Sequence, residues 1–169
     1  MNINDLVSEF QNHTTELIKL VNSLSGEDYD RKPSPEKWSV SEVIVHLYIS
    51  EKLFTNVLNG NCKSAERNPL EKIPLLKGVF LNLESNYNAP EIIQPKTGVK
   101  KLKDDMLLKL TEIRNGLAAS LIEKNPEELC LDFAHPQLGL MTRIELGHLA
   151  WYHSIRHENQ IKKTIAILC

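Results

Sequence analysis

Residues 142–164 read TRIELGHLAWYHSIRHENQIKKT and combine a helix start signal with a helical apolar pattern. Residues 142–145 match the capping box, in which a Thr side chain and a Glu three residues later satisfy the first free N–H groups of a helix. Leu146, Leu149, Ala150 and Ile161 then follow at the three- and four-residue spacing of one helix face. The stretch therefore predicts an amphipathic helix that begins at Thr142 and continues almost to the end of the sequence.

The same kind of pattern predicts three earlier helices. Apolar residues recur at helical spacing from residue 3 to residue 24, and a second capping box at residues 39–42 opens a helix that ends at an Asn-Gly pair suited to a left-handed stop. A third pattern runs over residues 99–125 and ends before Pro126, which cannot continue a helix. Because no segment shows the alternation of a strand, we predict an all-α four-helix bundle.

The connection between the second and third predicted helices, residues 60–97, is longer than loops in bundles usually are. Since about ten extended residues already span a helix of 30 Å, these two helices could run parallel. We expect a short helix near residues 70–83 in this crossover. Its apolar residues would either cover a functional site or plug the side of the bundle: Leu75, Val79, Phe80 and Leu83.

Length and composition favour one ordinary globular domain over residues 1–169. The chain is 41% hydrophobic and 25% charged, with only 7 Gly and 8 Pro, which excludes collagenous and low-complexity classes. Lys plus Arg total 20 against 22 for Asp plus Glu, so no global positive field favours nucleic acid. The lysines near residues 96–103 are followed at once by Asp104 and Asp105, as in a solvated helix start.

Cysteine usage and hydropathy indicate the compartment. Cys62, Cys130 and Cys169 are odd in number and form no Cys-x-x-Cys pair, so we expect free thiols rather than a disulfide framework. No run of 18 apolar residues predicts a membrane span, and residues 1–5 do not resemble a signal peptide. We therefore expect a cytoplasmic protein that does not bind membranes.

Two histidines interrupt the buried stripe of the last predicted helix. His153 and His157 are four residues apart, so their side chains lie one turn apart on the same face. His46 lies at the inward edge of the second helix. Buried imidazoles need partners, and either a metal ion or hydrogen bonds to Ser50, Gln160 or backbone carbonyls would supply them.

A metal held by His46, His153 and His157 would have three neutral nitrogen ligands and one open position, as in catalytic zinc sites. Nickel or ferrous iron would also accept imidazoles, whereas magnesium and calcium prefer oxygen. The other histidines are weaker candidates. His148 is predicted on the opposite, exposed face, His13 in the core or in a supporting role, and His135 in a loop before Pro136.

Two stretches resemble the DinB/YfiT-like superfamily of helical bundles. Residues 37–47, KWSVSEVIVHL, are similar to the family's Trp-Ser/Thr…His-Leu opening of the second helix. Residues 153–161, HSIRHENQI, resemble its His-x-x-x-His-x-x-Gln-Ile signature and follow FAHP at residues 133–136 and GLMT at residues 139–142. The resemblance implies a four-helix bundle with zinc or nickel on His46, His153 and His157, in a family of often dimeric proteins that includes hydrolases and thiol-dependent S-transferases.

The leading functional hypothesis is therefore a metal-dependent enzyme acting on a small molecule. It would either transfer a low-molecular-weight thiol to an electrophile or hydrolyse a small substrate. Glu42, Glu51 and Glu145 are interpreted as helix caps or solvated charges, so no general base is assigned, and this favours thiol transfer. The alternative hypothesis is a non-catalytic metal- or ligand-binding bundle, such as a dimeric stress-response module.

Overall fold

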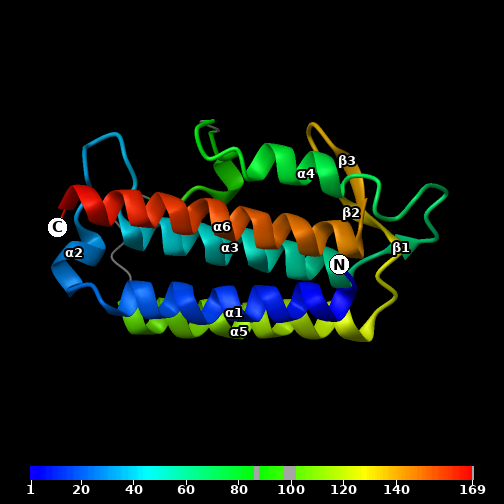
Figure 1. The fold of residues 1–169 in the computed structure, drawn as a ribbon, viewed down its shortest axis with the longest axis horizontal. Helices are drawn as coiled ribbons and strands as arrows, with labels where there is room; N and C mark the ends of the chain where they lie inside the picture. Colours follow the sequence, from blue (N-terminus) through cyan, green and yellow to red (C-terminus); the bar gives the residue numbers. More distant parts are fainter. Residues whose placement is uncertain (86–87, 97–101, 169) are drawn as a thin grey trace.

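Four long helices form the body of the molecule in the computed structural model, which describes residues 1–85, 88–96 and 102–168 (Figure 1). They are α1 (Ile3–Asn22), α3 (Val40–Asn59), α5 (Lys103–Glu123) and α6 (Arg143–Leu168). α3 and α5 begin at the same end of the bundle and run parallel, whereas α1 and α6 run the other way (Figure 1). The four predicted helices are thus present, and the long crossover allows two of them to be parallel. The predicted start of the third helix at Val99 lies outside the described residues.

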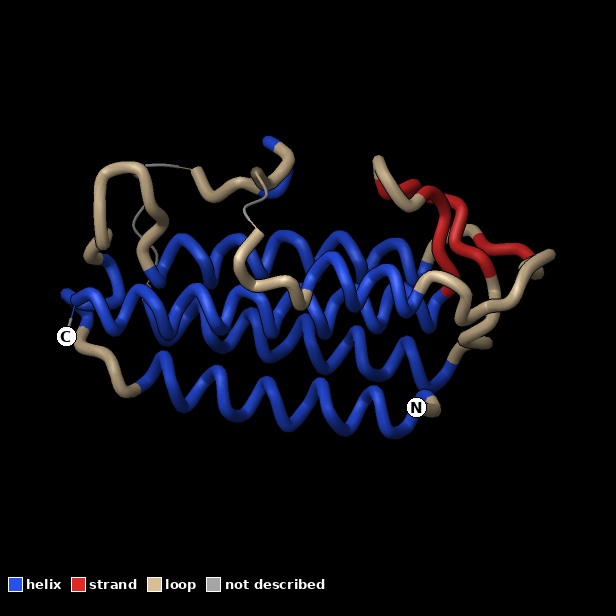
Figure 2. Tube along the Cα trace, turned by 45° about the horizontal axis from the view of Figure 1, so that its top comes forward, coloured by secondary structure: helices blue, strands red, loops and turns tan. Residues whose placement is uncertain are grey.

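Two short helices, one 3₁₀ helix and three strands lie outside the four-helix body in the described part of the chain. They are the helices α2 (Gly26–Asp30) and α4 (Ile73–Phe80), the 3₁₀ helix η1 (Glu91–Ile93) and the strands β1 (Cys62–Lys63), β2 (Leu129–His135) and β3 (Gly139–Thr142). The strands form one antiparallel sheet in the order β1-β2-β3. Figure 2 shows this sheet at the end of the bundle where α6 begins. Among the described residues, no helix combines the length and apolar character that crossing a bilayer requires.

The small sheet corrects the all-α prediction. Within β2 only Cys130 is buried, while Leu131 stays 39% exposed. A strand without a buried face carries no clear apolar-polar alternation, and this explains why the sequence pattern gave no sign of it. The hairpin between β2 and β3 contains Gly139 with φ of 65°, a left-handed conformation that glycine adopts without strain.

The predicted capping boxes open α3 and α6. At α3 the Ser39 N–H donates to Glu42 Oε2 over 2.9 Å and the Glu42 N–H donates to Ser39 Oγ over 3.3 Å. At α6 the Thr142 N–H donates to Glu145 Oε2 over 2.9 Å. Glu145 is fully buried and also accepts from the Arg67 guanidinium and from the Lys72 N–H. The α6 cap therefore also holds the start of the crossover against the bundle.

The crossover contains the expected short helix, but with a different inward face. Leu76 of α4 is fully buried, whereas Leu75 is 55% exposed and does not belong to the underside. Val79, Phe80 and Leu83 are half-buried. The prediction for Leu75 was wrong because α4 is only two turns long, so a shift of one residue changes which side chain faces the bundle.

A buried ion pair lies in the middle of the bundle. Glu51 of α3 accepts two hydrogen bonds from Arg114 of α5, from Nε over 2.8 Å and from Nη2 over 2.7 Å, and both residues are at most 1% exposed. Arg114 also donates to Thr14 of α1 and to Ser154 of α6. The pair therefore links all four long helices. The interpretation of Glu51 as a cap or a solvated charge was wrong, because its carboxylate faces α5 across the core.

The polar network continues from Ser154 to His13 of α1. The Ser154 hydroxyl lies 3.3 Å from His13 Nδ1, and His13 Nε2 lies 3.1 Å from the Glu158 carboxylate. Arg114 donates to the Ser154 oxygen, so the Ser154 O–H is left to donate to His13 Nδ1, and His13 Nε2–H donates to Glu158. A neutral His13 satisfies every group in this chain. His13 thus supports the core, one of the two roles predicted for it.

Acid should destabilise the protein through His13. Burial, and next the charge of Arg114, lower the pKa of His13 from 6.5 to about 4. Because an unfolded His13 binds a proton below about pH 6.5 and the folded one does not, this contribution to stability is complete above pH 6.5 and is lost as pH falls toward 4. We expect a loss of about 1–3 kcal/mol between pH 7 and pH 4 from this group.

Urea denaturation of metal-free protein at several pH values measures this loss. His13→Gln keeps a donor for Glu158 and an acceptor for Ser154 but cannot titrate, so its stability should fall less steeply with acid than that of the natural chain. Equal slopes for the two proteins would contradict the assignment.

Candidate metal centre

Three histidine side chains meet between α3 and α6. His46 projects from α3, and His153 and His157 project from successive turns of α6. His153 Nε2 lies 3.1 Å from His46 Nε2 and 3.1 Å from His157 Nε2. The three nitrogens lie within 4.8 Å of one another. The structure therefore brings together the three residues that the sequence selected.

The outer nitrogens of two rings show which tautomer each ring adopts. His46 Nδ1 lies 2.8 Å from the Ile93 carbonyl oxygen, and His157 Nδ1 lies 2.9 Å from Gln160 Oε1. A carbonyl oxygen only accepts, so both Nδ1 atoms carry the proton. The Nε2 atoms of His46 and His157 therefore present lone pairs toward the centre of the cluster. Ser50, which the sequence suggested as a partner, donates instead to the backbone carbonyl of its own helix at His46.

His153 cannot satisfy both of these lone pairs. If its Nε2 carries a proton, it donates to one neighbour and leaves the other lone pair without a donor. If its Nδ1 carries the proton, three lone pairs converge. In addition, His153 Nδ1 is buried and has no hydrogen-bond partner among the described residues. Hydrogen bonds alone leave a buried nitrogen unsatisfied in either case, which is costly.

A divalent transition ion fits this donor set. Metal–nitrogen bonds of about 2.0–2.1 Å at tetrahedral angles separate the nitrogens by about 3.3 Å, close to the 3.1 Å observed. The hydrogen bonds on the far side of His46 and His157 orient both rings, as supporting partners of metal-binding imidazoles do.

Burial keeps the three rings neutral. It lowers the pKa of His46 below 6.5, against the opposing effect of the hydrogen bond to Ile93. Burial and the neighbouring His46 lower the pKa of His157 to about 3, and burial together with both neighbouring rings places the pKa of His153 well below 6.5. Neutral imidazole is the form that binds metal ions, so the site is ready to do so at pH 7.

Aromatic rings and the crossover enclose the cluster. The Trp38 ring centroid lies 5.0 Å from that of His46, and the Phe54 and Phe80 centroids lie 6.1 Å and 6.0 Å from that of His153. Phe80 belongs to α4, which lies beside α6 (Figure 1). The crossover also contributes the Ile93 carbonyl, and Arg156 of α6 donates to the carbonyl of Asn82 over 2.8 Å. The long connection therefore forms one wall of the site.

A comparison with protein families identifies the fold. The model of the DinB superfamily matches residues 9–161, nearly the whole chain. The chain belongs to the DinB superfamily. It is also 26% identical over 157 residues to the uncharacterized protein YuaE of Bacillus subtilis, covering 93% of this chain and 95% of YuaE. No solved structure matches the chain.

Two further histidines of this DinB-superfamily chain lie apart from the cluster. His148 was predicted at the surface but is only 2% exposed, because residues 143–150 of α6 are all buried. Its Nδ1 lies 2.9 Å from the Ile144 carbonyl oxygen of the same helix. His135 ends β2, and its ring centroid lies 6.4 Å from that of Phe80.

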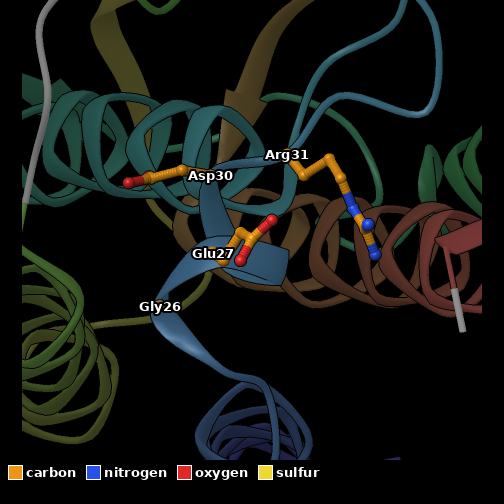
Figure 3. A pocket seen from close by; sticks show the side chains of 4 residues that line it. All are labelled: Gly26, Glu27, Asp30 and Arg31. Atoms are coloured by element: carbon orange, nitrogen blue, oxygen red, sulfur yellow. The ribbon is translucent and has the colours of Figure 1, made fainter.

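A separate hollow in this DinB-superfamily fold lies at α2. It has a volume of about 480 Å³ and is lined by Gly26, Glu27, Asp30 and Arg31 (Figure 3). None of the three clustered histidines lines it. Its walls offer only surface side chains, so the chemistry concentrates at the histidine cluster.

Proposed function

We propose that the chain is a metal-dependent enzyme of the DinB superfamily, a thiol-dependent S-transferase or a hydrolase of small substrates, with zinc or nickel on His46, His153 and His157. The observation that carries this proposal is the convergence of the three Nε2 atoms, two of them with lone pairs fixed by hydrogen bonds on the far side. Family membership supports the same site.

The residues around the site would have two roles, which are to bind the ion and to shield it from solvent. The bound ion would act as a Lewis acid and lower the pKa of a thiol or water ligand, supplying a nucleophile near neutral pH. His46, His153 and His157 would hold it through neutral nitrogens and leave a position open. Trp38, Phe54 and Phe80 lie against the cluster and would limit its contact with bulk water, which would strengthen electrostatic interactions inside the site.

The glutamates favour thiol transfer over hydrolysis. Glu42 closes the α3 cap, Glu145 closes the α6 cap and binds Arg67, and Glu51 is paired with Arg114. Each carboxylate is thus engaged in holding the fold. Hydrolysis needs a group that accepts a proton from water, whereas a thiol loses its proton more readily and needs such a group less.

A turnover assay tests the proposal. Metal-loaded protein is mixed with a low-molecular-weight thiol, such as glutathione or cysteine, and the electrophile 1-chloro-2,4-dinitrobenzene, and thioether formation is followed by absorbance. We expect a rate above that of the metal-free protein, and a return to the background rate in His153→Ala. Ester and amide substrates test the hydrolase branch under the same conditions.

The alternative is a non-catalytic bundle that binds a metal or ligand through the same histidines. The cover that α4 and η1 place over the cluster favours it, because it restricts access. Stoichiometric metal binding without turnover of any thiol, ester or amide would support this alternative over the enzyme.

The crossover should control access to the site through Phe80. Replacing Phe80 with alanine removes the ring that covers His153, so a bound ion should pass to a competing chelator several-fold faster, with metal content and helicity retained. Leu75→Ala on the same helix is the matched control, because Leu75 is 55% exposed. Stopped-flow chelator competition and thermal melts measure both effects. A large loss of stability without faster release would show that Phe80 only plugs the bundle.

A further inference from the structure

Two cysteines outside the histidine cluster face each other across the sheet. Cys62 of β1 pairs with Cys130 of β2, and their sulfur atoms lie 3.6 Å apart. Cys130 is fully buried, whereas Cys62 is partly exposed. A thiol pair with one accessible and one protected member is suited to exchange reactions with small disulfides.

The register of the strands places the pair at a separation that a disulfide spans. The Leu131 N–H donates to the Asn61 carbonyl over 2.9 Å, so residues 61 and 131 occupy the hydrogen-bonded position next to the cysteines. Cys62 and Cys130 therefore occupy a non-hydrogen-bonded position, where Cα atoms are about 4.5 Å apart. Disulfides join Cα atoms about 4.4–6.8 Å apart, so no strand needs to move to form the bond.

Hydrogen bonds between Asp132 and Asn61, next to the cysteines, stabilise this register. Asp132 accepts from the Asn61 N–H over 2.8 Å and from Asn61 Nδ2 over 3.0 Å. Gly60 leaves room for these two hydrogen bonds, because a Cβ atom there would clash with Asp132 Oδ2. Gly60 was predicted as a left-handed stop, but its φ of −85° is ordinary. Its missing side chain leaves space for the Asp132 carboxylate that binds Asn61 beside the cysteine pair.

We propose that Cys62 and Cys130 form a reversible disulfide by reaction with a low-molecular-weight disulfide. The Cys62 thiolate attacks one sulfur of the small disulfide, forms a mixed disulfide and releases one small thiolate. Cys130 then attacks Cys62 Sγ, which forms the Cys62–Cys130 bond and releases the second small thiolate. The two protein thiols are oxidised, their two protons pass to the two released thiolates, and one small disulfide is reduced to two thiols.

The surroundings fix the order of these two steps. Burial, and next the hydrogen bond that the Cys130 thiol makes with Cys62, raise the pKa of Cys130 to about 12, so Cys130 stays protonated until its neighbour is activated. Cys62 is the sulfur that a small disulfide reaches first, because Cys130 has no exposed surface. This exchange involves no histidine and does not depend on the metal centre.

Oxidised glutathione tests the proposal on the reduced full-length chain. The sequence contains 3 cysteines, so denatured protein should present three thiols before treatment and one afterwards. The intact mass should fall by two hydrogens without a retained adduct, and peptide mapping should link Cys62 to Cys130. The oxidised form should melt at a higher temperature, and dithiothreitol should reverse every change. A stable glutathione adduct on Cys62, or three unreacted thiols, would overturn the proposal.

Three variants separate this pair from other thiol chemistry. Cys169→Ser should still lose both remaining thiols, whereas Cys62→Ser should keep Cys130 reduced. Cys130→Ala should stop at the mixed disulfide on Cys62. If Cys130→Ala does not fold, the proposal is tested by Cys62→Ser, at a partly exposed position, and by the peptide map of the natural chain. If the intact mass of Cys62→Ser also fell by two hydrogens, Cys62 would not be the partner of Cys130, and the assignment of this disulfide would be refuted.

Discussion

Replacing His153 with alanine should remove nearly all bound metal from the purified protein. His153 Nε2 lies 3.1 Å from both of the other Nε2 atoms, so its loss leaves only two ligands on different helices. Because even supporting residues of metal sites contribute about 10–100-fold in affinity, we expect at least a 100-fold loss here. Elemental analysis of protein purified without a histidine tag, with chelator competition, measures it. His46→Ala and His157→Ala should behave similarly.

The remaining histidines provide the controls for this experiment. His148→Ala should keep the metal, because its Nδ1 is bound within α6 to the Ile144 carbonyl. Since His148 is buried, circular dichroism must accompany the measurement, and the half-buried His135→Ala gives a second control. If all five variants lost metal equally, the convergence of three particular rings would not explain binding.

Replacing Arg114 with methionine should cause the largest loss of stability among the variants considered. The change leaves the fully buried Glu51 carboxylate without its counter-ion and removes the donor to Thr14 and Ser154. Breaking a buried pair from one side costs about 3–5 kcal/mol. For a chain of this length the melting temperature should fall on the order of 10 °C. Urea and thermal unfolding both measure the effect.

A double variant distinguishes the unpaired charge from lost packing. Glu51→Leu with Arg114→Met removes both charges and should recover much of the stability that Arg114→Met alone loses. The loss in Arg114→Met should also shrink toward acid, because burial raises the pKa of Glu51 and favours the protonated form. A double variant as unstable as the single one would mean that packing, rather than the charge, dominates at this position.

The sequence predicts the helices and the histidine cluster because both follow from periodicity. Each long helix has an apolar face, and α3 and α6 begin at the two predicted capping boxes, whose hydrogen bonds the structure contains. His153 and His157 are one turn apart on such a face, so any packing of α6 that buries one ring also brings the other close. His46 follows from the same argument on α3.

Other features of the structure have a weak signal in the amino-acid sequence, or no signal at all. The Ile93 carbonyl that orients His46 is a backbone group whose position depends on the crossover, so no residue type marks it. His148 is buried because elements on both sides cover the start of α6, and a single-face argument does not anticipate this. Arg114 did have a signal. It lies four residues after Leu110 and three before Leu117, on the buried stripe of α5, where an arginine requires a buried partner.

The distance along the chain between the clustered rings gives a bound ion a second effect. His46 and His153 are 107 residues apart, so an ion shared by them closes a loop that contains most of the fold. Such an ion would lower the conformational entropy of the unfolded chain, as a long-range cross-link does. The shared site can also form only when α3 and α6 are neighbours. A sample refolded with excess metal that regains full helicity but binds no ion would therefore not have brought α3 and α6 together, and metal binding becomes a measure of topology that circular dichroism cannot provide.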